Sequence, residues 1–382
     1  MACPEADEGS CDQRPVPVIT DARCPMTSEI HKLLQEMVER RASDLHITAG
    51  VPPQFRIDGT LVPSDRAPLN PLESRELSYG MIDEKRIARL EAEKGLDTSI
   101  SAEGLGRFRL NIFYQRGSVA AAVRHLPWEI PPMEELGVPL IMKDLCEKLN
   151  GLVLISGPTG SGKSTTMASM ISYINDHKNV HVISIEDPIE YLHRHKFSII
   201  NQREIGRDAP SFASAVRQVL RQDPDVICIG EIRDLETVRT ALTMAETGHL
   251  VLTTVHTSEA PQAISRIVDI FPPHEQQGVR TQISLSLQGV LVQQLLPDAS
   301  GVGRVLATEL MVANAAVRNL IRENNLQQLR SAIETGAKDG MHSMNSSLLR
   351  LESEKRITTE KAIASSNDIK GIMRELSRPV RS

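Results

Sequence analysis

Two patterns of hydrophobic and polar residues follow each other along the chain. Between residues 27 and 126, apolar residues first recur at helical spacing, and short alternating segments follow. These segments cover residues 44–48, 54–57, 60–62, 98–102, 106–114 and 118–125, and residues 72–94 have a helical composition. Asp58-Gly59 lies between two of the segments and is typical of a β-hairpin turn. The pattern predicts a small α+β domain.

The second pattern begins near Gly151. Residues 152–155, 180–185, 226–229 and 250–255 form short, nearly continuous apolar runs with helical segments between them. Such runs are typical of a parallel sheet that helices cover on both faces. Two further apolar segments, 291–296 and 304–311, predict a hairpin added to this sheet, and the chain is helical in pattern from residue 315 onward.

Prolines and charges mark the boundaries of these regions. Four prolines and many charges in residues 1–26 predict a disordered tail, and four prolines in residues 127–150 predict a linker. We therefore divide the chain into a tail (1–26), an N-terminal α+β domain (27–126), a linker (127–150), an α/β domain (151–312) and a helical C-terminal region (313–382).

Composition narrows the classes of function. The net charge of −6 argues against broad binding to nucleic acid, which needs a cationic surface. None of the five cysteines forms a C-x-x-C pair, so we expect no zinc site, and their scattered positions indicate a reducing compartment. No run approaches the ~18 apolar residues of a membrane span, and no secretory signal is visible.

One glycine-rich run carries the strongest chemical signal, Gly157-Pro158-Thr159-Gly160-Ser161-Gly162-Lys163-Ser164. It matches the phosphate-loop pattern G-x-x-x-x-G-K-[ST] at every fixed position, after a short apolar strand and before a helix. The glycines permit a tight turn whose N–H groups point at an anion, and the helix adds its positive dipole end. We expect Lys163 to reach the β and γ phosphates, Ser164 to bind Mg²⁺, and Thr165 to extend the nucleotide site. The run predicts binding of ATP with Mg²⁺.

A second motif lies in residues 220–234, where an apolar strand ends in an acidic residue. Glu231 is at the position where a carboxylate beside the phosphate loop holds Mg²⁺ or its water. Gly230 stands where most ATPases have an aspartate. A lone acidic residue after a strand is usually a solvated loop charge, but its pairing with a complete phosphate loop favours the metal-binding interpretation.

These two motifs, together with acidic and histidine boxes at residues 185–190 and 248–257, resemble the type II/IV secretion ATPase superfamily. They are most similar to the type IV pilus retraction ATPases, the PilT/PilU family, from about residue 27 to the C-terminus. The resemblance implies a PAS-like N-terminal domain, a RecA-like P-loop ATPase domain with a helical C-terminal tail, and a ring-shaped homohexamer. It also implies ATP hydrolysis that drives pilus retraction and twitching motility.

The resemblance implies the setting of this activity as well. The protein would be cytoplasmic and peripheral at the inner face of the inner membrane. Its partners would be other copies of itself, an inner-membrane pilus platform protein and a paralogous retraction ATPase, with no nucleic acid.

The resemblance also implies roles for residues of the two boxes. Glu190 would be the general base that activates water, and Glu186 and Asp187 would support Mg²⁺ or the loop. His256, at the carboxyl end of a strand, would sense the γ phosphate. His249 would contact a neighbouring subunit or cap the preceding helix.

Arginines of the first domain are candidates for a finger that reaches the nucleotide of the next subunit. Among Arg107, Arg109, Arg116 and Arg124 we favour Arg109 and Arg124, with strand-surface charge as the alternative. Residues 316–321 resemble a C-terminal motif of retraction ATPases that docks a partner or couples hydrolysis to retraction. A core helix is the other interpretation. Residues 366–370 look more like the PilU branch, so the two branch markers conflict.

Three alternative functions remain open on the sequence. A pilus-assembly or secretion ATPase usually carries an extra N-terminal domain and a four-cysteine zinc site, and neither is visible here. A nucleic-acid translocase on the same core is disfavoured by the acidic net charge. An ATP-binding regulator without turnover is disfavoured by the intact Lys163, Glu190 and Glu231.

Overall fold

The computed structural model describes residues 27–57, 59–102, 104–126 and 129–377. The predicted tail, residues 1–26, lies outside these ranges, as does Asp58 of the predicted hairpin turn. The chain divides into two compact units, with the boundary between Leu126 and Pro127. No helix in the described ranges has both the length and the apolar character needed to cross a bilayer.

The first unit is an antiparallel sheet with helices packed on it. Its elements are α1 (Ser28–Glu39), β1 (Asp44–Ile47), β2 (Gln54–Ile57), β3 (Thr60–Pro63), α2 (Pro71–Tyr79), α3 (Glu84–Glu93), β4 (Gly95–Ala102), β5 (Gly106–Gln115) and β6 (Ser118–Leu126). The strand order is β3-β2-β1-β6-β5-β4, and all neighbours are antiparallel. One apolar core joins α1 to the sheet, with Phe55 and Phe108 fully buried. The alternating segments of the sequence therefore form strands as predicted.

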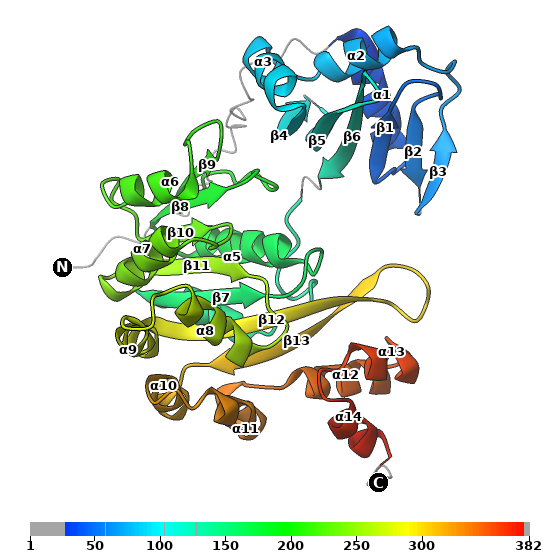
Figure 1. The fold of residues 1–382 in the computed structure, drawn as a ribbon. Helices are drawn as coiled ribbons and strands as arrows, with labels where there is room; N and C mark the ends of the chain where they lie inside the picture. The colour runs from blue at the N-terminus through cyan, green and yellow to red at the C-terminus, as the bar shows by residue number, and fades with distance from the viewer. Residues whose placement is uncertain (1–26, 58, 103, 127–128, 378–382) are drawn as a thin grey trace, which may run out of the picture. The chain divides into compact units, whose positions relative to one another are not determined.

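The second unit is a mixed α/β domain built on a seven-stranded sheet (Figure 1). Its strands are β7 (Gly151–Ser156), β8 (His181–Glu186), β9 (Ile199–Glu204), β10 (Val226–Ile229), β11 (Leu250–Val255), β12 (Leu287–Pro297) and β13 (Arg304–Val312). The strand order is β13-β12-β7-β11-β10-β8-β9. Only β13 runs antiparallel to its neighbour, as half of the predicted hairpin. The parallel sheet predicted from the apolar runs is confirmed.

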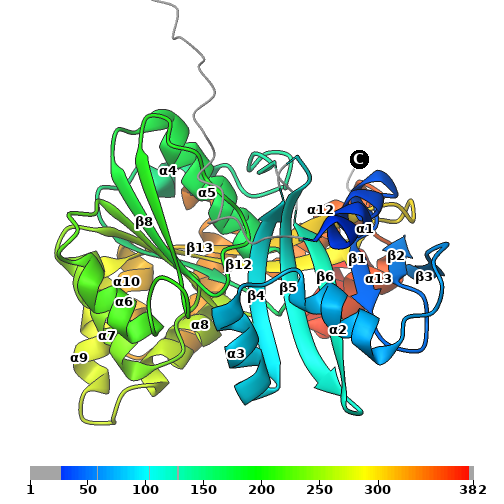
Figure 2. The same ribbon diagram turned by 90° about the horizontal axis from the view of Figure 1, so that it is seen from above.

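Helices cover both faces of this sheet because successive strand residues point to opposite sides. On one side, α4 (Ile141–Cys146) and α5 (Lys163–His177) pack against residues such as Val153 and Cys228. On the other side, α6 (Phe212–Val219), α7 (Leu235–Glu246), α8 (Ala260–Asp269) and α9 (Gln276–Ser286) pack against residues such as Leu152 and Ile227 (Figure 2). Both faces are apolar, which explains why the central strands read as continuous rather than alternating runs.

Two features of this unit differ from the sequence prediction. The described part of the predicted linker, residues 129–150, is not a separate linker, because Met133, Val138 and Met142 of α4 are buried in the core of the second unit. The carbonyl oxygens of Pro132 and Pro139 accept backbone hydrogen bonds in the turns that lead to α4. The edge strand β9 was not predicted, because only its first two residues, Ile199 and Ile200, are apolar and the next four are polar, which leaves no continuous apolar run.

The C-terminal region continues the second unit along the β13 edge of the sheet (Figure 1). It comprises α10 (Ala315–Arg322), α11 (Leu329–Thr335), α12 (Met344–Ser353), α13 (Thr359–Ser365) and α14 (Ile369–Leu376), with 3₁₀ turns at Leu326–Gln328 and Ala337–Asp339. This agrees with the helical pattern of the sequence.

The partner-docking motif of the sequence analysis falls on α10 and has a structural role in this chain. Val317 and Ile321 are fully buried against α9. The Arg318 guanidinium donates to the carbonyl oxygens of Ser284 and Leu285, each at 2.8 Å, at the end of α9. Cations at a helix C-terminus satisfy carbonyls that lack intrahelical partners. Arg318 therefore caps α9, and burial lowers the pKa of its guanidinium.

We predict that Arg318→Ala destabilises the second unit by roughly 1–3 kcal/mol, because two carbonyls lose charge-assisted hydrogen bonds. Denaturant unfolding followed by circular dichroism measures the change. Arg322→Ala, which removes an exposed arginine from the same helix, is the control and should leave the midpoint unchanged. Equal midpoints for the two variants would contradict the capping role.

Candidate functional site

The order of the parallel strands brings the predicted motifs to one edge of the sheet. Adjacent strands β7, β11, β10 and β8 run in the same direction, so their carboxyl ends meet. The phosphate loop follows β7, His256 follows β11, Glu231 follows β10, and the acidic box ends beyond β8. Ligands of open α/β sheets bind at the carboxyl ends of strands. This edge is the candidate site.

The phosphate loop turns through conformations that only glycine adopts readily. Gly157, Gly160 and Gly162 have φ values of 143°, 79° and 89°. A Cβ atom at Gly157 would lie 2.4 Å from the carbonyl oxygen of Gln293 on the neighbouring strand β12. The close approach requires glycine, and α5 then begins at Lys163, with its N-terminus directed at the loop.

The Lys163 ammonium lies over the loop. Its Nζ donates to the carbonyl oxygens of Gly157 (2.8 Å) and Pro158 (2.9 Å). Burial lowers the pKa of Lys163, and the carboxylates of Glu231 and Glu190 oppose this change. Lys163 therefore interacts electrostatically with both acidic residues that the sequence analysis selected.

The loop fits a phosphate group on the geometry of its own residues. The Ser161 hydroxyl is buried and has no hydrogen-bond partner among the described residues. Three positive-φ glycines, a helix N-terminus and a lysine surround it, which is the donor set that a polyphosphate requires. Ser164, at the second position of α5, is exposed. Its hydroxyl and a carboxylate are oxygen ligands of the kind that Mg²⁺ prefers.

Glu231 is held from two sides. Arg233 pairs with it at 2.7 Å, and His256 Nε2 lies 3.2 Å from Glu231 Oε2, so the imidazole donates to the carboxylate when Nε2 carries the proton. Gly230, at the position of the usual aspartate, lies close to the neighbouring strand. A Cβ there would lie 3.2 Å from the carbonyl oxygen of Ile185 on β8, so a larger residue would need a shift of a few tenths of an ångström.

The acidic box is organised by strand β9, which the sequence analysis missed. Glu186 accepts hydrogen bonds from Ser184 (2.6 Å) and Gln202 (3.1 Å). The buried Glu204 accepts from the Ile189 backbone N–H at 3.2 Å and so fixes the segment that leads to Glu190. No local pattern marks Gln202 or Glu204, because an edge strand with mixed polarity resembles a loop.

The two histidines of the histidine box differ in their surroundings. His256 contacts Glu231 as described, at the carboxyl end of β11. His249, at the other end of the strand, has Nδ1 3.1 Å from the carbonyl oxygen of Met244 near the end of α7. Of the two roles considered for His249, the helix-capping contact is present within the chain.

The candidate arginines lie in the first unit and have partners there. Arg109 pairs with Asp97 at 2.7 Å, and Arg124 pairs with Asp44 at 2.9 Å. Arg109 and Arg124 face each other across β5 and β6, and the Arg124 side chain is 64% exposed. Arg107 is buried and donates to Ser99, which removes it from the candidates for contact with another subunit.

Two cavities of the second unit flank the phosphate loop. One, of about 650 Å³, is lined by Thr159, Arg233, His256 and Thr257 among others. The other, of about 540 Å³, is lined by Gly162, Thr165, Gln293 and Arg304 among others. The first therefore adjoins the Glu231–His256 pair, and the second adjoins the start of α5.

Comparisons with known proteins place this chain in a family. The chain matches the model of the type II/IV secretion system protein family over residues 20–362. It is 45% identical over 336 residues to the type IV pilus retraction ATPase PilT of Pseudomonas aeruginosa, covering 87% of this chain and 97% of the relative. It is 41% identical over 345 residues to the type IV pilus ATPase PilU of the same species, covering 90% of each.

The fold is also similar to solved structures. The crystal structure of the pilus retraction motor PilT with bound ADP matches with a TM-score of 0.85 at 52% identity, covering 90% of this chain and 99% of that chain.

We predict that Lys163→Ala abolishes hydrolysis and weakens nucleotide binding, because it removes the cation nearest the phosphates. Turnover and the affinity for a fluorescent nucleotide measure the two effects. Lys196→Ala, which removes an exposed lysine paired with Asp176 on α5, is the control and should keep both properties. Turnover near the wild-type rate in Lys163→Ala would exclude the loop from its assigned role.

Proposed function

The chain belongs to the type II/IV secretion system protein family and, within it, to the type IV pilus retraction ATPases, and from that membership we propose how its site works. It hydrolyses ATP to drive pilus retraction. One observation carries the proposed mechanism. Strands that end at one sheet edge are followed by the phosphate loop, Glu190, Glu231 and His256. At this edge both carboxylates interact electrostatically with Lys163.

We assign the residues of this edge as follows. The loop N–H groups and Lys163 bind the phosphates of ATP, and Ser164 and Glu231 hold Mg²⁺, the latter partly through water. Bound Mg²⁺ neutralises phosphate charge. Glu190 orients a water molecule and accepts its proton as the water oxygen bonds to the γ phosphorus and the bond to the leaving ADP oxygen breaks.

Each flanking cavity receives one end of the substrate in this proposal. His256 contacts Glu231, which lies on the γ-phosphate side of the site in this proposal. Loss of the phosphate after hydrolysis would therefore change the contact at the end of β11. The cavity beside Thr165 accepts the nucleoside, since it opens from the start of the helix that binds the phosphates.

The assembly is a further part of the proposal. We propose a homohexamer in which Arg109 or Arg124 of one subunit neutralises charge at the nucleotide of the next. To do so, the arginine would have to exchange its present partner, Asp97 or Asp44, for the phosphate. The first unit would be PAS-like and the second RecA-like. The ring would act at the inner face of the inner membrane on a platform protein, alongside a paralogous retraction ATPase.

We predict that Glu190→Gln binds ATP normally but hydrolyses it about 10²–10⁴-fold more slowly, since an amide keeps the shape but cannot accept a proton. Glu246→Gln, which changes an exposed carboxylate at the end of α7, is the control and should keep wild-type turnover. If Glu231→Gln binds ATP without hydrolysing it and Glu190→Gln is active, the roles assigned to these two carboxylates must be exchanged.

The same variant tests retraction in the organism that encodes the chain. A strain with Glu190→Gln in place of the wild-type gene should keep surface pili but fail to retract them and fail to twitch. Normal retraction in that strain, with the variant protein inactive in vitro, would contradict the assignment of this ATPase to retraction.

We predict that hydrolysis depends on contact between subunits. Specific turnover should rise with protein concentration, and a mixture of Lys163→Ala and Arg124→Ala subunits should recover part of it. Some interfaces would then combine an intact phosphate loop with an intact arginine.

The control mixture combines Lys163→Ala with Glu190→Gln. Both residues serve the same subunit's edge, so no interface is complete and activity should stay absent. Equal recovery in the two mixtures, no recovery in mixed rings shown to form, or full activity from a monomer would contradict the trans arginine.

A further inference from the structure

The loop that carries His256 is held from two sides. This histidine loop, residues 256–259, connects the end of β11 to the start of α8. On its inner side, the Ser156 hydroxyl donates to the Thr257 carbonyl at 2.7 Å, and the Thr257 N–H donates back to Ser156 Oγ at 3.0 Å. Ser156 is the last residue of β7, directly before the phosphate loop. The inner contact therefore joins the histidine loop to the nucleotide edge.

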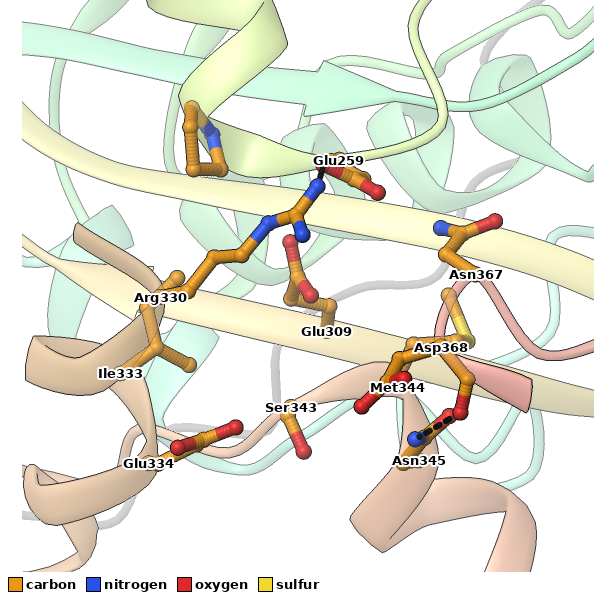
Figure 3. Close-up of a pocket in the computed structure, with 11 residues that line it drawn as sticks. Glu259, Glu309, Arg330, Ile333, Glu334, Ser343, Met344, Asn345, Asn367 and Asp368 are labelled. Carbon is orange, nitrogen blue, oxygen red and sulfur yellow. Dashed lines mark hydrogen bonds and ion pairs between the residues drawn. The ribbon is translucent and has the colours of Figure 1, made fainter. Parts of the chain in front are cut away.

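Residues of the C-terminal region hold the outer side of the same loop (Figure 3). Asn367 Nδ2 donates to the carbonyl oxygen of Ser258 at 2.8 Å. Arg330 of α11 pairs with Glu259 at 2.5 Å, and the Glu259 side chain is only 10% exposed. These contacts connect segments 71 and 109 residues apart in the chain.

A buried carboxylate completes the outer side. Glu309, on β13, accepts a hydrogen bond from the Ala260 N–H at 2.8 Å, at the first residue of α8. Burial raises the pKa of Glu309, while hydrogen bonds from the backbone of Ala260 and Met344 oppose the rise. Met344 begins α12, so one carboxylate serves the starts of two helices, one from the ATPase core and one from the C-terminal region.

The turn that presents Asn367 is itself fixed. Ser366 donates to Asn345 at 2.6 Å, and Asn345 donates to the Asp368 carbonyl at 3.1 Å (Figure 3). Asp368 caps α14 by accepting from the Gly371 N–H. This turn belongs to residues 366–370, which the sequence analysis noted only as a branch marker. An anchored donor restricts the histidine loop more than a mobile side chain would.

We propose that Arg330 and Asn367 are positioning residues for ATP hydrolysis, which hold the histidine loop so that His256 stays on Glu231. The proposal rests on the function assigned above. His256 lies only 3.2 Å from Glu231, and a small displacement of its loop would break that contact. The C-terminal helices would then act on hydrolysis through this loop, without touching the nucleotide.

The test compares turnover and nucleotide affinity in the assembled protein. Asn367→Ala and Arg330→Ala should each lower kcat roughly 3- to 30-fold and leave the KM for ATP within about twofold. Arg330→Lys keeps the charge opposite Glu259 and should recover part of the loss. Arg239→Ala, which breaks the ion pair with Glu275, is the matched control and should keep wild-type kcat.

A second measurement follows the loop directly. Amide hydrogen exchange should rise at Thr257 and Ala260 in both variants and stay at wild-type rates in Arg239→Ala. Wild-type kcat in both variants, or loss of kcat with unchanged exchange, would overturn the positioning role. These outcomes presuppose an active wild-type protein; a wild-type chain without turnover would instead contradict the proposed function.

Discussion

The parallel alignment of β7, β11, β10 and β8 is the constraint on which the rest of the site depends. Their register pairs Val255 with Ser156, the last residues of β11 and β7, and pairs Ile229, the last residue of β10, with Ile185, one residue before the end of β8. The strands β7, β10 and β11 are fully buried, β8 is buried between its two end residues, and helices on both faces hold the sheet rigid. Groups far apart in the sequence therefore reach one edge without any long side chain having to bridge a gap. A rigid edge of this kind fixes the positions of charges before substrate binds.

Charge at this edge explains why it suits a metal-bound triphosphate. Two carboxylates, Glu190 and Glu231, act on the buried ammonium of Lys163. The carboxylate oxygens favour a cation, and the glycine loop with its helix N-terminus favours an anion. ATP with Mg²⁺ supplies both. Gly157 serves this arrangement sterically, because a Cβ there would lie 2.4 Å from the carbonyl oxygen of Gln293 on the adjacent strand.

Motif and apolar pattern were enough to predict that the phosphate loop, Glu231 and His256 follow buried strands, since these features are local in the chain. What the sequence could not supply depends on tertiary contacts. Glu204 reaches the acidic box only through the edge strand β9, and residues 127–150 read as a linker although their apolar side chains complete a core. Residues 316–321 resembled a motif for docking or coupling, but within this chain Arg318 caps α9 because α10 packs there. The Asn367–Ser258 contact spans 109 residues and leaves no local pattern.

A structure of the assembled protein with Mg²⁺ and a non-hydrolysable ATP analogue tests the central claim most directly. The account predicts that the terminal phosphate lies at the edge formed by β7, β8, β10 and β11. Lys163 Nζ would leave the carbonyls of Gly157 and Pro158 for the phosphate oxygens, Mg²⁺ would lie near Ser164 and Glu231, and Glu190 would face the γ phosphorus. A terminal phosphate bound elsewhere, or Glu190 directed away from it, would contradict the account.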